Sequence, residues 1–214
     1  MESTTAETGG AATGATDDKN RKTIGDYVGD LVALESHIEE ALDRQLPLAK
    51  DLPVAREAIQ RFHDAVRGSR DAIKQFQEQR GDTAQKPIVQ AGAALLGKAA
   101  GLIDKLRTEG VSKALRDDYT AFNHAAISYT MLHATALALG DQAAAQQAER
   151  GLKAYAGMVQ EINHLIGDVT IEELRRDKHE IVDAQAAITN RAAVDRIWKQ
   201  TAKGGKTPGA KVAG

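Results

Sequence analysis

A single acidic side chain, Glu35, lies where the sequence predicts a buried helical face. Leu31, Ile38 and Leu42 recur around it at the spacing of one apolar face of a long helix. A carboxylate on the edge of such a face is costly to bury unless it is paired, protonated or bound to a metal. We interpret Glu35 as a buried acid paired with Arg67 or with a tyrosine, and metal binding is the alternative.

Histidines supply the other groups that could bind a metal. His133 lies on the predicted apolar face of a helix over about 112–139, and we favour a core histidine hydrogen-bonded to a tyrosine or a carboxylate. The alternative is that His133 binds a metal together with Glu35. Glu161 and His164 have the Glu-x-x-His spacing of metal ligands on a helix. Because they fall on the solvent-facing side, we interpret them as part of a solvated helix end.

The overall composition excludes several classes of protein. The chain has no cysteine, which excludes disulfides, iron–sulfur clusters and thiol catalysis. The formal net charge of -2 argues against a dedicated nucleic-acid-binding protein. No apolar run approaches the roughly 20 residues that a membrane-spanning helix needs, and the N-terminus lacks the pattern of a secretory signal. We therefore expect a soluble, cytoplasmic protein.

The elements that must position these side chains are helices. Hydrophobic residues make up 42% of the chain and aromatic residues only 4%, a profile that suits closely packed helices better than sheets. A Thr170–Glu173 capping box predicts that one more helix starts near the C-terminal end. Apolar periodicity predicts four long helices, at about 23–49, 53–80, 112–139 and 141–166. The parts of the chain are then a disordered leader (1–22), a helical bundle (23–168), an additional C-terminal helix (169–200) and a disordered basic tail (201–214).

Connection lengths indicate how the long helices are arranged. Short turns join the first pair and the second pair, so each pair is predicted to be an antiparallel hairpin. A crossover of about 30 residues, helical over about 87–107, separates the hairpins. We therefore predict an all-α fold, a ferritin-like four-helix bundle with a helical crossover and an extra C-terminal helix. An irregular helical array is the alternative, because the crossover helix could pack as an equal member.

Four stretches of the sequence are similar to segments of a known family: DLVALESHIEEAL (30–42), DAVRGSRDAIKQF (64–76), KPIVQAGAALLGKAAGLIDKL (86–106) and FNHAAISYTMLHATALALGD (122–141). Through them the chain resembles the YciE/YciF-type ferritin-like bacterial stress proteins. The resemblance covers about two-thirds of the chain and implies a ferritin-like fold, a dinuclear metal site and a role in stress.

The metal ligands that the resemblance implies are mostly absent from this chain. Glu35 matches the glutamate of the first helix, but the Glu-x-x-His positions of the second helix hold Asp64 and Arg67. Arginine has no lone pair to offer a metal. Ala125 and Tyr155 fall where the later helices should supply acids. We therefore expect a degenerate site at Glu35, Arg67, Ala125 and Tyr155, and favour no metal or other cofactor. The residual candidate metal ligands are Glu35, Asp64 and His133.

The C-terminal end suggests how partners could bind. Arg196 and the residues after it include five basic side chains and no acid. Such a tail can contact nucleic acid weakly through Lys199, Lys203, Lys206 and Lys211, although a solubilising tail is the favoured interpretation. The additional helix is expected either to cover the bundle or to form the interface of a homodimer or of a complex with another protein. We expect no membrane contact.

These observations predict a ferritin-like bundle protein with a degenerate metal site and a structural or protein-interaction role in stress response. Enzymatic activity is not expected. The first alternative is a functional dinuclear-metal protein, with iron or manganese, that uses Glu35 and recruits His133. The second alternative is association with nucleic acid through the basic tail.

Overall fold

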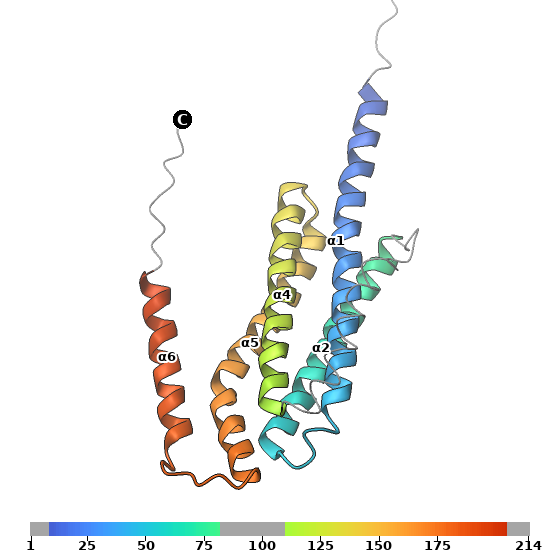
Figure 1. Ribbon diagram of the computed structural model, residues 1–214. Helices are drawn as coiled ribbons and strands as arrows, with labels where there is room; N and C mark the ends of the chain where they lie inside the picture. Colours follow the sequence, from blue (N-terminus) through green and yellow to red (C-terminus); the bar gives the residue numbers. More distant parts are fainter. Residues whose placement is uncertain (1–8, 82–109, 205–214) are drawn as a thin grey trace, which may run out of the picture.

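The computed structural model describes residues 9–81 and 110–204, and these segments are helical with short connections (Figure 1). The predicted crossover helix over about 87–107 lies outside the described residues. The helices of the described segments are α1 (Gly9–Gln45), α2 (Pro53–Gln79), α4 (Val111–Ala138), α5 (Gln142–Arg176) and α6 (Ala186–Gly204).

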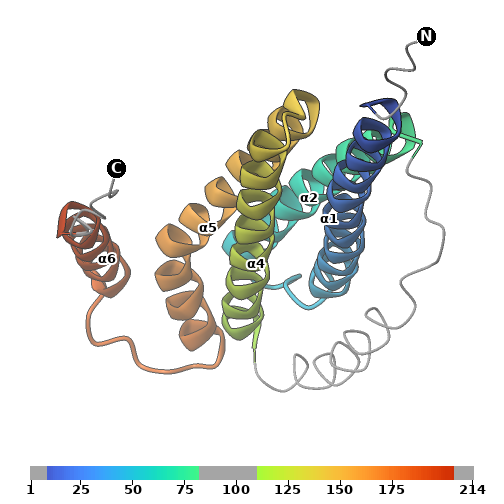
Figure 2. The same cartoon turned by 90° about the horizontal axis from the view of Figure 1, so that it is seen from above.

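Four of these helices form a bundle. Helices α1 and α2 pack as one hairpin, and α4 and α5 pack as another. Helix α1 also contacts α4, and α2 contacts α5, so the two hairpins lie side by side around one shared core (Figures 1 and 2). This arrangement confirms the predicted all-α, ferritin-like fold. No helix in the described part of the chain is both long and apolar enough to cross a membrane.

Local sequence signals explain where several helices begin and end. Pro53 occupies the first turn of α2, where its missing N–H is not needed. Gly140 adopts a φ of 78°, which lets the chain reverse between α4 and α5. Asp141 then caps α5, since its side chain accepts a hydrogen bond of 2.9 Å from the Ala144 amide. These signals place the helix boundaries within one or two residues of those expected for α2 and α4.

An aromatic row runs through the middle of the bundle. The Phe62 and Phe122 rings meet edge to face at 5.4 Å, and Phe122 meets Tyr155 at 5.9 Å. Tyr129 stacks on Tyr155 at 5.9 Å. The Tyr129 ring in turn rests on Gly151, where an added Cβ would lie 2.2 Å from a ring carbon. Glycine at this position therefore lets α4 and α5 approach closely around the row.

The leader predicted over 1–22 is wrong for its second half, because α1 already begins at Gly9. Ile24 and Val28 are buried and anchor the helix against the bundle. Extending a formed helix adds one backbone hydrogen bond for each residue fixed, so the preceding residues can join it. Arg21 also donates a hydrogen bond to the backbone carbonyl of Arg80, the residue that follows α2, which ties this extension to the bundle.

The predicted boundary between the bundle and an additional helix over 169–200 is also wrong. Helix α5 continues through Gly167 to Arg176, and the additional helix α6 starts only at Ala186 and includes part of the predicted tail. Thr170 caps no helix, since its hydroxyl donates to the Ile166 carbonyl one turn earlier at 2.8 Å. Glu173 instead accepts a hydrogen bond from the Val111 amide and caps the start of α4. The capping-box pattern is real in sequence, but its acid serves a different helix.

Helix α6 lies outside the four-helix core, against the outer side of α5 (Figure 2). The contact is largely polar: Arg191 donates to the His164 carbonyl at 3.1 Å and pairs with Asp168. The His164 imidazole lies 3.1 Å from the Asp195 carboxylate. His164 is exposed, as predicted for the solvent-facing side, although α5 continues beyond it and α6 contacts it. Glu161, the other residue of the Glu-x-x-His pattern, pairs with Arg61 at 2.6 Å.

Candidate functional site

Each of the four bundle helices contributes one side chain to a polar layer around Glu35. Glu35 of α1 is fully buried, and its Oε1 accepts hydrogen bonds from Ser69 of α2 at 2.7 Å and from Tyr129 of α4 at 2.8 Å. The Ser69 and Tyr129 hydroxyls lie 3.3 Å apart. Tyr155 of α5 completes the layer beside Tyr129. We call these four residues the Glu35 layer.

The electrostatics of the Glu35 layer favour a protonated acid. Burial raises the pKa of Glu35 to about 7, although the hydrogen bonds from Ser69 and Tyr129 and the charge of Arg70 act in the opposite direction. Burial and the neighbouring carboxylate likewise raise the pKa of the Tyr129 and Tyr155 hydroxyls above their usual range. Near neutral pH, Glu35 therefore exchanges a proton while the two tyrosines keep theirs.

Two buried oxygens of the Glu35 layer have no hydrogen-bond partner, Oε2 of Glu35 and the hydroxyl of Tyr155. The Glu35 carboxyl group and the Tyr155 hydroxyl also interact with each other electrostatically. A buried polar atom without a partner costs about 1–3 kcal/mol. The Tyr155 hydroxyl is a donor and Oε2 is an acceptor, so a small rotation can join them in either protonation state of the acid. Burial, and not the hydrogen bonding of the layer, is therefore what raises the pKa of Glu35.

A second charged cluster lies one helical turn along α1, at Glu39. Glu39 is buried and accepts from Arg67 at 3.0 Å and from Arg70. His63 is also buried, with Nε2 2.8 Å from an Asp43 oxygen. This cluster, which we call the Glu39 cluster, joins α1 to α2 through ion pairs. It also explains why Arg67 does not pair with Glu35.

The structure places the other predicted site residues away from Glu35. Asp64 is exposed and accepts a hydrogen bond from Gln60 at 3.0 Å. His133 is only half-buried, because Leu132 occupies the core position, so the prediction of a core histidine is wrong. The predicted face of α4 matches the buried one at Tyr129 but is displaced by one residue at His133, where Leu132 is buried instead. Ala125 is fully buried and contributes only a methyl group to the core.

Sequence reasoning did not identify all members of the two polar groups. Ser69 and Tyr129 both fall on predicted apolar faces, and a hydroxyl within such a face is a usable signal for a buried hydrogen bond. The position of Glu39, one helical turn after Glu35, is a second signal, in this case for another buried acid. No local signal identifies His63 as buried, because the Asp43 carboxylate that its Nε2 contacts comes from α1.

A third buried acid, Asp118, lies apart from both groups, where the end of α1 meets the first turns of α4. Its Oδ1 accepts a hydrogen bond from Gln45 at 2.8 Å, and its Oδ2 has no partner. Burial raises the pKa of Asp118 to about 7, and the neighbouring Asp117 adds to this effect. This contact links the start of the second hairpin to the end of α1.

The donors of the Glu35 layer do not fit the dinuclear metal site that the resemblance implies. Such a site uses several carboxylates and two histidines on facing helices. The layer offers one carboxylate, one aliphatic hydroxyl and two phenols whose raised pKa values keep them protonated. Within residues 9–81 and 110–204, no three or more Asp, Glu, His or Cys side chains are grouped so that they could hold a metal ion.

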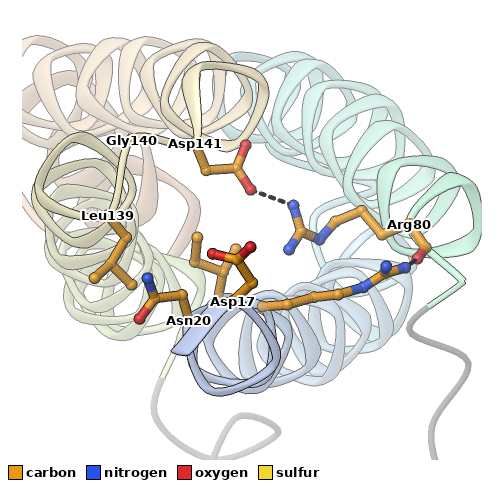
Figure 3. Close-up of a pocket in the computed structure, with 8 residues that line it drawn as sticks. Asp17, Asn20, Arg80, Leu139, Gly140 and Asp141 are labelled. Atoms are coloured by element: carbon orange, nitrogen blue, oxygen red, sulfur yellow. Dashed lines mark hydrogen bonds and ion pairs between the residues drawn. The ribbon is translucent and has the colours of Figure 1, made fainter. Parts of the chain in front are cut away.

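A charged surface pocket of about 340 Å³ lies at the end of the bundle, where the α4–α5 turn faces α1 and α2 (Figure 3). Arg80 extends across it and pairs with Asp141. The same Arg80 accepts the Arg21 hydrogen bond through its backbone carbonyl. We interpret the pocket as part of the packing between hairpin ends. Its lining residues are Asp17, Asn20, Arg21, Ile24, Arg80, Leu139, Gly140 and Asp141.

Comparisons with known proteins agree with this fold. Residues 22–175 match the family described as a domain of unknown function, DUF892. The crystal structure of protein XCC3681 from Xanthomonas campestris pv. campestris is similar, with a TM-score of 0.62 and 16% sequence identity, over 74% of this chain and 99% of that chain. At this identity the likeness shows the fold alone. None of the curated proteins matches the chain. The chain therefore belongs to the DUF892 family, the YciF-like group of ferritin-like proteins.

Proposed function

We propose that this protein is a ferritin-like bundle with a degenerate metal site, which acts in stress response through a structural or protein-interaction role rather than as an enzyme. The observation that carries the proposal is the hydrogen bonding of Glu35. Its Oε1 accepts from Ser69 and Tyr129. Hydroxyl groups thus bind the acid that a ferritin-like metal centre would use as a ligand.

The surroundings of Glu35 support a structural role for the Glu35 layer rather than a catalytic one. Glu35, Tyr129 and Tyr155 are fully buried, so a substrate would have to separate the helices to reach the carboxyl group. The two hydrogen bonds to Glu35 join α1 to α2 and to α4, and buried polar contacts of this kind help to fix how helices align. The layer therefore suits a role in holding the two hairpins in register.

The charges near the layer also oppose cation binding. Arg70 and Arg67 lie on α2 beside the acids of α1, and both pair with Glu39. Positive charge at these positions repels a divalent ion and occupies the nearest second carboxylate. Ala125 leaves α4 without a ligand at the position where the resemblance implies one.

Elemental analysis of the purified protein tests the proposal against the metal-binding alternative. The protein is expressed with iron and manganese supplied, and metal content is measured for wild type, Glu35→Ala and the control Asp64→Ala, which removes an exposed acid. We expect well below one ion per chain in all three. Near-stoichiometric iron or manganese that is lost only in Glu35→Ala would overturn the proposal. The unpartnered Oε2 of Glu35 is the feature that favours this alternative.

The role in stress is tested by complementation of a deletion strain under osmotic, acid and peroxide stress. Glu35→Gln keeps the size of the side chain and its acceptor for Tyr129, but it cannot ionise or act as a metal-bridging carboxylate. We expect Glu35→Gln and wild type to restore survival equally. A Glu35→Gln protein that is present at wild-type level but fails to restore survival would show that ionisation or metal binding is needed.

Of the lysines predicted to contact nucleic acid, only Lys199 has a described side chain, and it is exposed on α6. The chain of Lys203 is helical, and Lys206 and Lys211 lie outside the described residues. Nucleic-acid association thus stays a prediction, to be tested by binding to duplex DNA at physiological salt.

A further inference from the structure

Two buried polar side chains meet where the end of α1 packs against the start of α4. Gln45 is the last residue of α1 and is 3% exposed, and Asp118 lies two turns into α4 and is 4% exposed. The amide nitrogen Nε2 of Gln45 donates a hydrogen bond to Oδ1 of Asp118 at 2.8 Å. The other oxygen of the contact on each side, Oε1 of Gln45 and Oδ2 of Asp118, is buried and has no hydrogen-bond partner among the described residues.

The chemistry of these two oxygens limits what can satisfy them. An amide oxygen only accepts hydrogen bonds, and so does an ionised carboxylate. Two acceptors cannot bond to each other, and a buried acceptor without a donor is destabilising. The Glu35 layer is different, because the unpartnered group beside its acid is the Tyr155 hydroxyl, which can donate. At Asp118, a single proton on Oδ2 creates a donor toward Gln45 and satisfies both oxygens at once.

The charges near Asp118 also favour the neutral acid. Burial is the largest cause of its raised pKa, and the neighbouring Asp117, another acid, adds to the effect. Charged groups on the adjoining turns of α1, the α1–α2 connection, α4 and α5 have partners of their own. These are Arg44 with Glu40, Asp43 with His63, Lys50 with Asp51, Arg116 with Asp117, and Glu173 with the Val111 amide.

We propose that Asp118 carries a proton in the folded protein and forms a cyclic acid–amide pair with Gln45. In this pair Nε2 of Gln45 donates to Oδ1, and Oδ2 of Asp118 donates to Oε1. We call it the Asp118–Gln45 pair. It fastens α1 of the first hairpin to α4 of the second at one end of the bundle. The inference is independent of the proposed function, because the pair shares no residue with the Glu35 layer.

The Asp118–Gln45 pair should hold this end of the bundle most firmly in acid. Asp118 has a pKa of about 7 when buried, against 3.8 when solvated, so opening of the contact releases a proton between these values. Local opening should therefore become about tenfold more frequent from pH 5 to pH 6, and it should level off above pH 7. Asparagine at position 118 carries an N–H in place of the acid O–H and keeps the pair without a proton. Asp118→Asn should remove the pH dependence.

Hydrogen exchange of the backbone amides of residues 111–120 measures this opening, after correction for the intrinsic pH dependence of exchange. We expect the opening to rise with pH in the wild type and to stay constant in Asp118→Asn. The matched control is Asp64→Asn, which changes an exposed acid that also accepts a hydrogen bond from a glutamine, Gln60, at 3.0 Å. It should behave as the wild type does. Opening that keeps its pH dependence in Asp118→Asn, or loses it in Asp64→Asn, would overturn the proposal.

Infrared spectroscopy distinguishes the Asp118–Gln45 pair from an acid that is merely buried. A protonated carboxyl group has its own carbonyl band, and hydrogen bonding moves that band to lower frequency. At about pH 6, below the pKa of Asp118, we expect a band that is absent in Asp118→Asn. It should move to higher frequency in Gln45→Leu, which removes both partners of the acid.

Either of two infrared results would refute the pair: Asp118→Asn removes no protonated-carboxyl band, or Gln45→Leu leaves the band where it is. Circular dichroism checks that each variant keeps its helices. The two substitutions alter opposite sides of the contact, so one of them decides the question if the other prevents folding.

Discussion

Replacing Glu35 with glutamine should change how the stability of this protein depends on pH. The pKa of Glu35 is raised from an ordinary 4.5 to about 7 in the folded protein. Between these values the folded state keeps a proton that the unfolded state has released. Because the folded state binds more protons, the free energy of unfolding falls as pH rises through this window. Well below pH 4.5 and well above pH 7, Glu35 adds no further pH dependence to the free energy of unfolding.

The size of the effect follows from the difference in pKa. At 1.36 kcal/mol for each unit, the shift of Glu35 corresponds to about 3 kcal/mol of unfolding free energy lost between pH 4.5 and pH 8. Glu35→Gln cannot ionise, so it should lack this loss. We therefore expect Glu35→Gln to gain about 3 kcal/mol relative to wild type across the window, even if the amide is slightly destabilising at pH 4.5.

Urea unfolding followed by circular dichroism at 222 nm measures this difference. The circular dichroism signal at 222 nm reports on helices throughout the bundle. Tryptophan fluorescence would report only on α6, because the single tryptophan lies exposed there. The difference between wild type and Glu35→Gln cancels contributions from other titrating groups, including Asp118, which lies in a separate contact. A difference that stays constant within about 0.5 kcal/mol from pH 4.5 to pH 8, despite the expected shift, would refute the argument that Glu35 is buried as a protonated acid.

Four further substitutions test the packing and hydrogen bonding of the protein. Gly151→Ala should destabilise the fold by about 1–3 kcal/mol in urea unfolding, because its Cβ would overlap the Tyr129 ring, whereas Gly157→Ala, with open space around it, should be neutral or stabilising. Equal effects of the two changes would contradict the close approach of α4 and α5. Tyr129→Phe should cost about 1–3 kcal/mol at pH 8, where the carboxylate of Glu35 loses a donor, and less at pH 4.5. An equal cost at both pH values would argue that this hydroxyl does not serve the ionised acid. Asp118→Asn should gain about 4 kcal/mol relative to wild type between pH 4 and pH 8, since burial raises the pKa of this group from 3.8 to about 7; a flat difference over that range would show that the acid is solvated.

The Glu35 layer resembles a metal site in its position but not in its chemistry. All four helices direct a polar side chain to the same level of the bundle, as they would to bind ions. The side chains at this level are hydroxyl groups, which share hydrogen bonds with a single acid. One carboxyl group with a pKa near 7 then titrates inside the bundle. The hairpins are thereby held together by hydrogen bonds whose strength depends on pH.

The amino-acid sequence alone determined much of this architecture. Apolar periodicity located α2 and α4 closely, because the period of 3.6 residues is a local property of the chain. Proline and glycine marked the turns for the same reason. The burial of Glu35 could also be inferred, since it lies among Leu31, Ile38 and Leu42 on one face. Matching motifs indicated the family.

Tertiary structure alone decided which side chains meet. Glu35 bonds to Ser69 and Tyr129, 34 and 94 residues away, and not to Arg67. That choice depends on how the four helices are positioned relative to one another along the bundle axis, which local sequence patterns do not encode. Helix α5 passes through Gly167 to Arg176, and Glu173, the acid of the apparent capping box, accepts from the first amide of α4 across the fold. A local pattern states what a side chain can bind, but only packing brings the competing partners within reach.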